Sequence, residues 1–176
     1  TLGTDPMLVA TFDGNDTITT GDGDDFIFVG PGDNEVSTGS GADTVLFDSQ
    51  SDISGQNTID LGVDADADTL DYTALGFNDG SFNRDFTNID SISNFDGAGD
   101  GDTIVFNAGN FSDPADPGIY EENLVPEASL SDLGDSAEIA FAGGAEYYFG
   151  VYNGNGYLVT DDIDDGWGKV FEFEGL

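Results

Sequence analysis

The chain has no cysteine and no histidine among its 176 residues, and its only basic side chains are Arg84 and Lys169. Without cysteine the fold has no disulfide and no thiolate nucleophile. Without histidine it lacks the commonest general base and a preferred ligand of zinc and copper. A pair of carboxylates could still serve a glycosidase, but no pattern of pocket-forming residues surrounds any pair. We therefore expect that the chain is not an enzyme.

Positive charge is almost absent, and the 37 acidic residues give a formal net charge of −35. This balance excludes binding to nucleic acid or anionic lipid by charge. No run approaches the roughly 18 apolar residues of a membrane span, so we expect no membrane insertion. Adaptation to high salt is one explanation of such an acidic surface, and binding of counter-cations is another, compatible one.

A nine-residue repeat occupies residues 12–47 without insertion, as FDGNDTITT, GDGDDFIFV, GPGDNEVST and GSGADTVLF. Each unit carries a glycine, then an acidic or amide residue two places later, then a β-branched residue after two more. In order, these are Gly14, Gly23, Gly32 and Gly41; Asp16, Asp25, Asn34 and Asp43; and Ile18, Ile27, Val36 and Val45. Each unit pairs a turn with a short strand, so two units complete one coil.

Stacking such coils places the carboxylates of one turn against those of the turn in the next coil. Successive coils lie about 4.8 Å apart, so the turn at 14–16 adjoins the turn at 32–34, and the turn at 23–25 adjoins that at 41–43. Two unit charges roughly 5 Å apart repel by about 3 kcal/mol at an effective dielectric near 20. A cation between the turns removes this repulsion. Aspartate oxygens and the carbonyls of glycine turns supply the six to eight oxygen ligands that Ca²⁺ prefers.

The repeat resembles the RTX, or haemolysin-type, calcium-binding nonapeptide GGxGxDxUx. The resemblance implies an all-β, right-handed parallel β-roll that binds several Ca²⁺ ions. The chain departs from the consensus at its first glycine, which is replaced by Thr20, Val29 or Thr38. A disordered Gly/Asp linker is the alternative, and the regularly spaced Ile and Val residues argue against it.

Irregular coils are expected to extend the roll from residue 55 to residue 106, giving a first domain of residues 1–106. An incomplete coil is also expected at 7–10. Short strands recur in GQNTIDL (55–61), DADTLDY (66–72), NIDSISNF (88–95) and GDTIVF (101–106), with insertions at 48–54 and 73–87. The string SISNFDGAGDGDTIVF resembles the last coil of serralysin-type protease C-terminal domains and of alginate epimerase R-modules. The predicted metal ligands beyond the regular repeats are Asn57, Asp68, Asp96 and Asp102.

Residues 107–176 form the expected second domain, an irregular excursion to about residue 136 followed by an antiparallel β cap. Its expected strands are 138–142, 146–152, 157–160 and 170–174, with a hairpin turn at 153–156. Asp161, Asp165, Gly166 and Glu172 match four positions of an EF-hand loop, but Ile163 replaces a required oxygen ligand. Asp64, Asp66 and Asp68 form a DxDxD string that lacks the following EF-hand glycine.

These patterns favour a secreted calcium-binding roll that acts as an extracellular structural or surface-assembly module, with homo-oligomers or filaments formed through the ends of the roll. The resemblance also implies an alternative, the calcium-dependent folding and type I secretion module of a larger hydrolase. Adhesin or ice-binding rolls need a row of like outward residues. The seventh and ninth positions of the four repeats show no such row: Thr17, Phe26, Glu35 and Thr44; and Thr19, Phe28, Ser37 and Leu46.

Overall fold

A computed structural model describes residues 3–47, 55–73, 86, 89–96, 99–106, 120–162 and 166–175. The chain divides into two compact units. The first comprises Thr1–Leu75 and Asp90–Asn107, and the second comprises Gly76–Ile89 and Ala108–Leu176.

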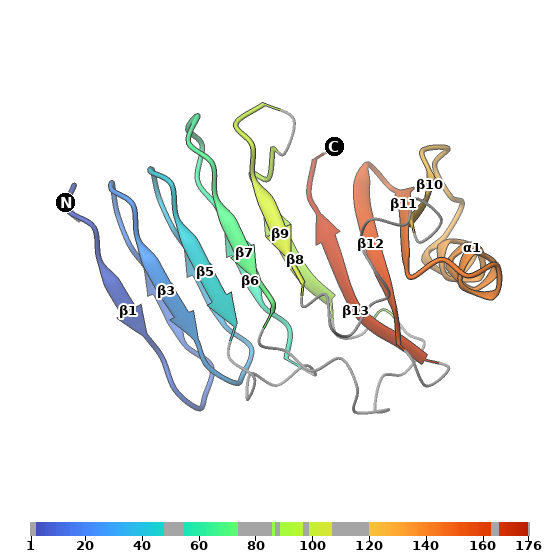
Figure 1. Ribbon diagram of the computed structural model, residues 1–176, viewed down its shortest axis with the longest axis horizontal. Helices are drawn as coiled ribbons and strands as arrows, with labels where there is room; N and C mark the ends of the chain where they lie inside the picture. Colours follow the sequence, from blue (N-terminus) through green and yellow to red (C-terminus); the bar gives the residue numbers. More distant parts are fainter. Residues whose placement is uncertain are drawn as a thin grey trace. The chain divides into compact units, whose positions relative to one another are not determined.

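The first unit is a parallel β-roll whose successive strands alternate between two sheets (Figure 1). Sheet A contains β1 (Leu8–Ala10), β3 (Phe26–Val29), β5 (Thr44–Phe47), β7 (Thr69–Asp71) and β9 (Thr103–Val105), paired in that order. Sheet B of the roll contains β2 (Thr17–Thr19), β4 (Glu35–Ser37), β6 (Thr58–Asp60) and β8 (Ile89–Ser93). The strands predicted at 7–10 and in the four irregular segments are confirmed.

The register confirms that two repeats make one coil. Ile18 pairs with Val36, and Ile27 with Val45, each eighteen residues apart. Past the regular repeats the alignment persists across longer separations, as in the pair formed by Ile59 and Ile92. The extra residues are accommodated in the connections, since a one-residue slip would turn the inward side chains outward. The predicted insertion at 48–54 and most of that at 73–87 lie outside the described residues.

Each half-coil buries an inward aliphatic residue that lies two places after a turn residue, and in every case except Ile92 that turn residue was predicted to bind metal. These side chains are almost fully buried: Ile18, Ile27, Val36, Val45, Ile59, Leu70 and Ile92. Thr20, Val29 and Thr38, which replace the first glycine of the consensus, are also buried. Burying one such aliphatic side chain contributes about 1.5–3 kcal/mol.

Outward residues of sheet A form a row that the sequence interpretation missed. Thr44 pairs with Thr69, and Thr69 with Thr103, whose hydroxyl oxygens lie 3.3 Å apart. The comparison covered the four regular repeats alone, whereas Thr69 and Thr103 belong to the irregular coils. Phe26 and Leu8 continue the same row, so it does not become a uniform polar surface.

The second unit contains β10 (Tyr120–Asn123), α1 (Leu130–Ala142), β11 (Tyr147–Tyr152), β12 (Asn155–Asp162) and β13 (Gly166–Phe173). Strands β11 to β13 are antiparallel, as predicted, whereas β10 pairs with β11 in parallel. Asn153 and Gly154, both with positive φ, form the tight turn between β11 and β12.

The expected strand at 138–142 is wrong, because these residues end helix α1. Alternation of Glu138, Ile139 and Ala140 is typical of a strand, but Ser129 caps a helix whose buried side chains include Leu133, Ala137 and Ala140. The expected irregular excursion to residue 136 is likewise wrong for its described part, which contains β10 and the start of α1.

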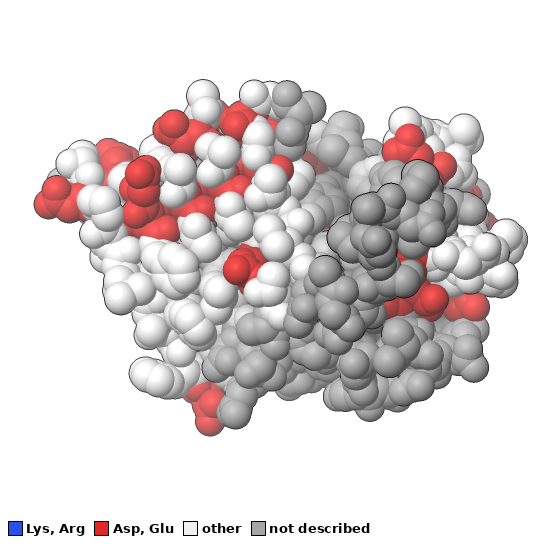
Figure 2. Space-filling view, in the orientation of Figure 1, with Lys and Arg blue, Asp and Glu red and all other residues white. Residues whose placement is uncertain are grey.

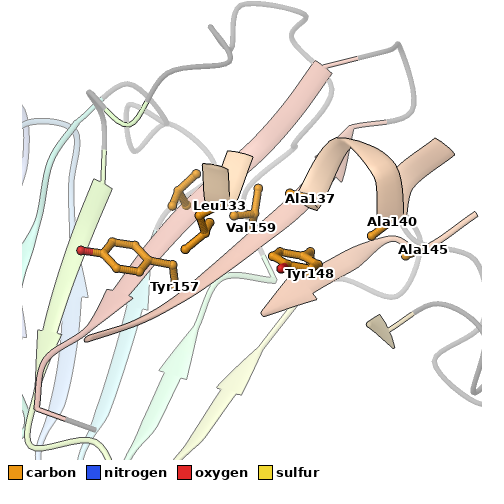
Figure 3. Close-up of a cluster of buried hydrophobic side chains, with 8 residues drawn as sticks. Leu133, Ala137, Ala140, Ala145, Tyr148, Tyr157 and Val159 are labelled. Atoms are coloured by element: carbon orange, nitrogen blue, oxygen red, sulfur yellow. The ribbon is translucent and has the colours of Figure 1, made fainter. Parts of the chain in front are cut away.

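The helix covers its own sheet through a small apolar core (Figure 3). The cluster consists of Leu133, Ala137, Ala140, Ala145, Tyr148, Tyr157, Val159 and Val170. Alanines at the contact let the helix backbone approach the aromatic rings of the strands closely. Among the described residues, no helix has the length and apolar character needed to cross a membrane.

Candidate metal centre

Four buried aspartates stack along the turns that lead into the strands of sheet A. The Oδ1 atom of each accepts a hydrogen bond from the backbone N–H at the equivalent position one coil earlier. Met7 donates to Asp25 (2.7 Å), Asp25 to Asp43 (2.7 Å), Asp43 to Asp68 (2.8 Å) and Asp68 to Asp102 (2.8 Å). We call these four aspartates the aspartate ladder. All four are at most 5% exposed.

A second ladder runs along the turns that lead into sheet B. Asp16 donates its backbone N–H to Oδ1 of Asn34 (3.0 Å), Asn34 to Asn57 (3.2 Å), and Asn57 to Asp90 (2.9 Å). We call Asp16, Asn34, Asn57 and Asp90 the asparagine ladder. Seven of the eight residues predicted as side-chain ligands thus lie in two ladders, one for each sheet.

Asp96 is the predicted ligand that joins neither ladder, and Asp90 is the ladder residue that the sequence interpretation missed. Asp96 is exposed and starts a turn, accepting the N–H of Gly99 on Oδ1 (2.7 Å). Asp90 is fully buried. Its signal is present in the sequence, because Asp90 precedes the inward Ile92 by two places, as Asp16 precedes Ile18.

The predicted turn glycines share one backbone conformation, with φ between 123° and 135° at Gly14, Gly23, Gly32 and Gly41. This region is accessible to glycine and costly for other residues. The turns also stack closely, since a Cβ added to Gly41 would lie 2.6 Å from the carbonyl carbon of Gly23. Only glycine lets adjacent turns approach this closely.

The electrostatics of the aspartate ladder are unfavourable in the chain alone. Burial raises the pKa of Asp43 to about 6, with added repulsion from Asp25 and Asp64. Burial raises the pKa of Asp68 to about 7, and the charges of Asp102, Asp43 and Asp64 contribute further. Oδ2 of Asp43 is buried without a hydrogen-bond partner. A buried, unpaired carboxylate oxygen of this kind is an appropriate ligand for a cation.

We predict that the metal-free chain loses stability as the pH rises from 5 to 7.5. The pKa values of Asp43 and Asp68 in the folded state exceed the ordinary aspartate value of 3.8. The folded state therefore holds more protons, and stability falls as pH passes through the raised pKa values. Thermal unfolding in EGTA, followed by circular dichroism at fixed ionic strength, measures this. A double variant, Asp43→Asn with Asp68→Asn, should flatten the dependence, and a wild-type chain more stable at pH 7.5 would contradict the prediction.

The aspartate ladder fits a calcium ion through the type of its oxygens. No group of three or more acidic side chains converges within the described residues, so main-chain carbonyls must supply much of any coordination shell. Glycine-rich turns make such carbonyls accessible. In Figure 2, acidic side chains gather on the turns above the outer face of sheet A. Their exposed members include Asp22, Asp24 and Asp66, which surround the ladder with further negative charge.

Two other cation motifs have different outcomes. The EF-hand alternative is wrong, because Asp161 and Glu172 belong to the paired strands β12 and β13, and Oε1 of Glu172 accepts the hydroxyl of Tyr157 (2.6 Å). Asp165 lies outside the described residues. In the DxDxD string only Asp68 joins a ladder. Oδ2 of Asp64 accepts the N–H of Gly41 (3.3 Å), which lies in the turn that precedes β5 of sheet A.

Comparison with known proteins identifies the repeat. Residues 11–45 match the RTX calcium-binding nonapeptide repeat in four copies. Neither a curated protein nor a solved structure shows significant similarity to the chain. The matched residues include Asp16, Asp25, Asn34 and Asp43, together with their four turn glycines. RTX repeats bind Ca²⁺ and are typical of secreted proteins.

Proposed function

Taking the chain as an RTX repeat protein, we propose that it is a secreted, non-enzymatic β-roll that folds on binding several Ca²⁺ ions and serves as an extracellular structural or surface-assembly module. The observation that carries the proposal is the aspartate ladder. Within the matched repeats it stacks Asp25 on Asp43 at buried positions, and it leaves Oδ2 of Asp43 without a hydrogen-bond partner. Calcium supplies the missing positive charge.

Location follows from the calcium requirement. Extracellular calcium modules work in the range of about 10⁻⁴–10⁻³ M, well above the calcium level of a cytosol. A roll of this affinity stays metal-free before export and orders in the medium, because a ligand that binds only the folded state stabilises it by mass action. Folding is thereby coupled to arrival outside the cell.

Assembly through the N-terminal end of the roll is supported by the first coil. Among the described residues, β1 pairs with β3 alone, and Leu8 is 78% exposed in it. Phe12, in the following turn, is 81% exposed. An open strand edge with apolar side chains is suited to pairing with another chain. The alternative function, a folding and secretion module of a larger hydrolase, needs no such contact between copies.

Calorimetric titration with Ca²⁺ tests the proposal on the wild type, Asp43→Ala and Asp22→Ala. Asp22 is an exposed carboxylate of the neighbouring turn, so its removal controls for net charge. We expect Asp43→Ala to weaken calcium binding at least tenfold, because it removes a buried charged ligand contributing about 1.5–3 kcal/mol. Asp22→Ala should change affinity less than threefold. Equal losses in both variants, or saturation by Mg²⁺ at the same concentrations, would contradict a specific calcium site.

Light scattering on the same calcium-loaded samples distinguishes the two biological roles. A surface-assembly module should form larger species with increasing protein concentration, and Leu8→Glu should reduce this association without altering calcium affinity. A wild-type chain that remains monomeric at high concentration would favour the appended folding and secretion module.

A further inference from the structure

In both ladders the Oδ1 atoms of the side chains make the same kind of hydrogen bond. The ladders differ at their interior positions, where the other polar atom of the side chain is Oδ2 in one ladder and Nδ2 in the other. In both, Oδ1 accepts the backbone N–H of the preceding coil. The remaining atom of an aspartate is an oxygen, which can bind a cation. The remaining atom of an asparagine is a nitrogen with two N–H groups, which can only donate. The chain places aspartate at the interior positions of one ladder and asparagine at those of the other.

In the asparagine ladder these N–H groups already occupy the oxygens that a cation would need. Nδ2 of Asn34 donates to the carbonyl oxygens of Gly30 (3.0 Å) and Gly32 (3.1 Å), and it lies 3.1 Å from Oδ1 of Asn57. Nδ2 of Asn57 donates to Oδ1 of Asp90 (3.2 Å). Two turn carbonyls beside Asn34 are therefore bonded to its amide and are not available to a cation.

The orientation of the Asn34 amide is fixed by its neighbours. The backbone N–H of Asp16 points at Oδ1 of Asn34 at 3.0 Å, so an acceptor must stand there. Turning the amide over to present its oxygen to a cation would place two donors against each other. It would also leave a buried N–H without a partner, which is costly. Asn34 is 2% exposed, so water cannot readily replace the lost bond.

The last residue of this ladder is also satisfied by neutral donors. Oδ1 of Asp90 accepts the backbone and side-chain N–H groups of Asn57, and Oδ2 accepts the hydroxyl of Tyr72 at 3.0 Å. The Tyr72 ring stacks on Phe47 at 4.2 Å between centroids, which holds the hydroxyl in place. Asp43 of the aspartate ladder, by contrast, has an unpartnered Oδ2.

We propose that the roll binds calcium along one side only, at the aspartate ladder, and that Asn34 and Asn57 form a metal-free hydrogen-bonded staple along the other. This inference rests on the proposed calcium binding and corrects the assignment of Asn34 and Asn57 as metal ligands. The amide N–H groups of the staple take the place of the cation. The staple therefore holds that side of the folded roll without an ion, while folding itself still depends on calcium at the aspartate ladder.

Asn34→Asp tests the staple, because it exchanges the blocking N–H₂ for an oxygen of nearly the same size. Native mass spectrometry at saturating Ca²⁺ should count at least one more ion in Asn34→Asp than in the wild type. The matched control is Asn15→Asp, which adds the same charge at an exposed position of the same stack of turns. It should leave the ion count unchanged. An unchanged count in a folded Asn34→Asp chain would overturn the inference.

A second measurement does not depend on the variant folding. Anomalous scattering from wild-type crystals grown with Tb³⁺ in place of Ca²⁺ should place ions beside Asp25, Asp43 and Asp68. An ion beside Asn34 or Asn57 would overturn the inference even if the ion count behaved as expected. A wild-type chain that binds no calcium at all would contradict the proposed function itself, whereas bound ions along both ladders would contradict this inference alone.

Discussion

Removal of calcium with EGTA should abolish most of the β-sheet signal of the roll at pH 7.5, and millimolar Ca²⁺ should restore it. At roughly 5 Å, each pair of stacked carboxylates repels by about 3 kcal/mol at an effective dielectric near 20. The two buried side chains of a half-coil of sheet A, such as Val45 and Phe47, contribute about 1.5–3 kcal/mol each. This gain does not offset both the repulsion and the entropy of ordering the residues of a repeat, which costs roughly 1–2 kcal/mol per residue. Stacked Asp43 and Asp68 therefore leave the metal-free roll without net stability.

Circular dichroism and amide hydrogen exchange measure this transition at constant ionic strength, which separates a specific ion from screening. Mg²⁺ at equal concentration is the matched control. It is smaller than Ca²⁺ and requires a near-ideal octahedral set of ligands, which a large and flexible oxygen site does not provide. A chelated chain that keeps its full sheet signal at pH 7.5 would show that burial alone holds the coils together. Recovery with Mg²⁺ equal to that with Ca²⁺ would indicate general charge screening.

Gly41→Ala should destabilise the calcium-loaded roll by roughly 2–6 kcal/mol. Two independent costs add at this position. The backbone has φ of +123°, where a non-glycine residue is strained by about 1–3 kcal/mol. The new Cβ would also lie 2.6 Å from the carbonyl carbon of Gly23, and overpacking of this kind costs about 1–3 kcal/mol. Urea unfolding at saturating Ca²⁺ measures the sum.

Gly14→Ala separates the two costs. Gly14 has nearly the same φ, +124°, but a Cβ added there would have no atom within 4 Å apart from those of the adjoining residues. This variant should therefore show the conformational cost alone and remain clearly more stable than Gly41→Ala. Equal losses in the two variants would mean that adjacent turns separate freely and that their close stacking contributes nothing.

The roll was predictable because three positions of the repeat each carry one kind of residue. These residues determine both the conformation of the turns and the oxygens available to a cation. Gly23, Asp25 and Ile27 repeat after eighteen residues, so the sequence predicted the pairing of alternate turns and of alternate strands. In each half-coil the ladder residue precedes the inward residue by two places, and this rule also finds Asp90 before Ile92. The insertion before Asp90 interrupts the nine-residue period, so the residue was missed. The difference between Asn34 and Asp43 became visible only through the direction of individual hydrogen bonds.

The second unit was less predictable because its signals are local and ambiguous. Ile139, Ala140 and Phe141 form an apolar run that is too short to distinguish a strand from a helix end. The helix is determined by the cap at Ser129 and by the packing of Leu133 and Ala137 on its sheet. Such tertiary contacts override a short alternating pattern.

The side-chain bonds of both ladders all point the same way along the chain. In every case a later residue accepts the N–H of an earlier coil, as Asp25 does for Met7 and Asp102 does for Asp68. The ladder bonds of a coil therefore need the coil that follows it, whereas the backbone bonds between coils run in both directions. A roll cut off after one of these coils would therefore leave the ladder N–H group of its last coil without the acceptor that the full chain supplies.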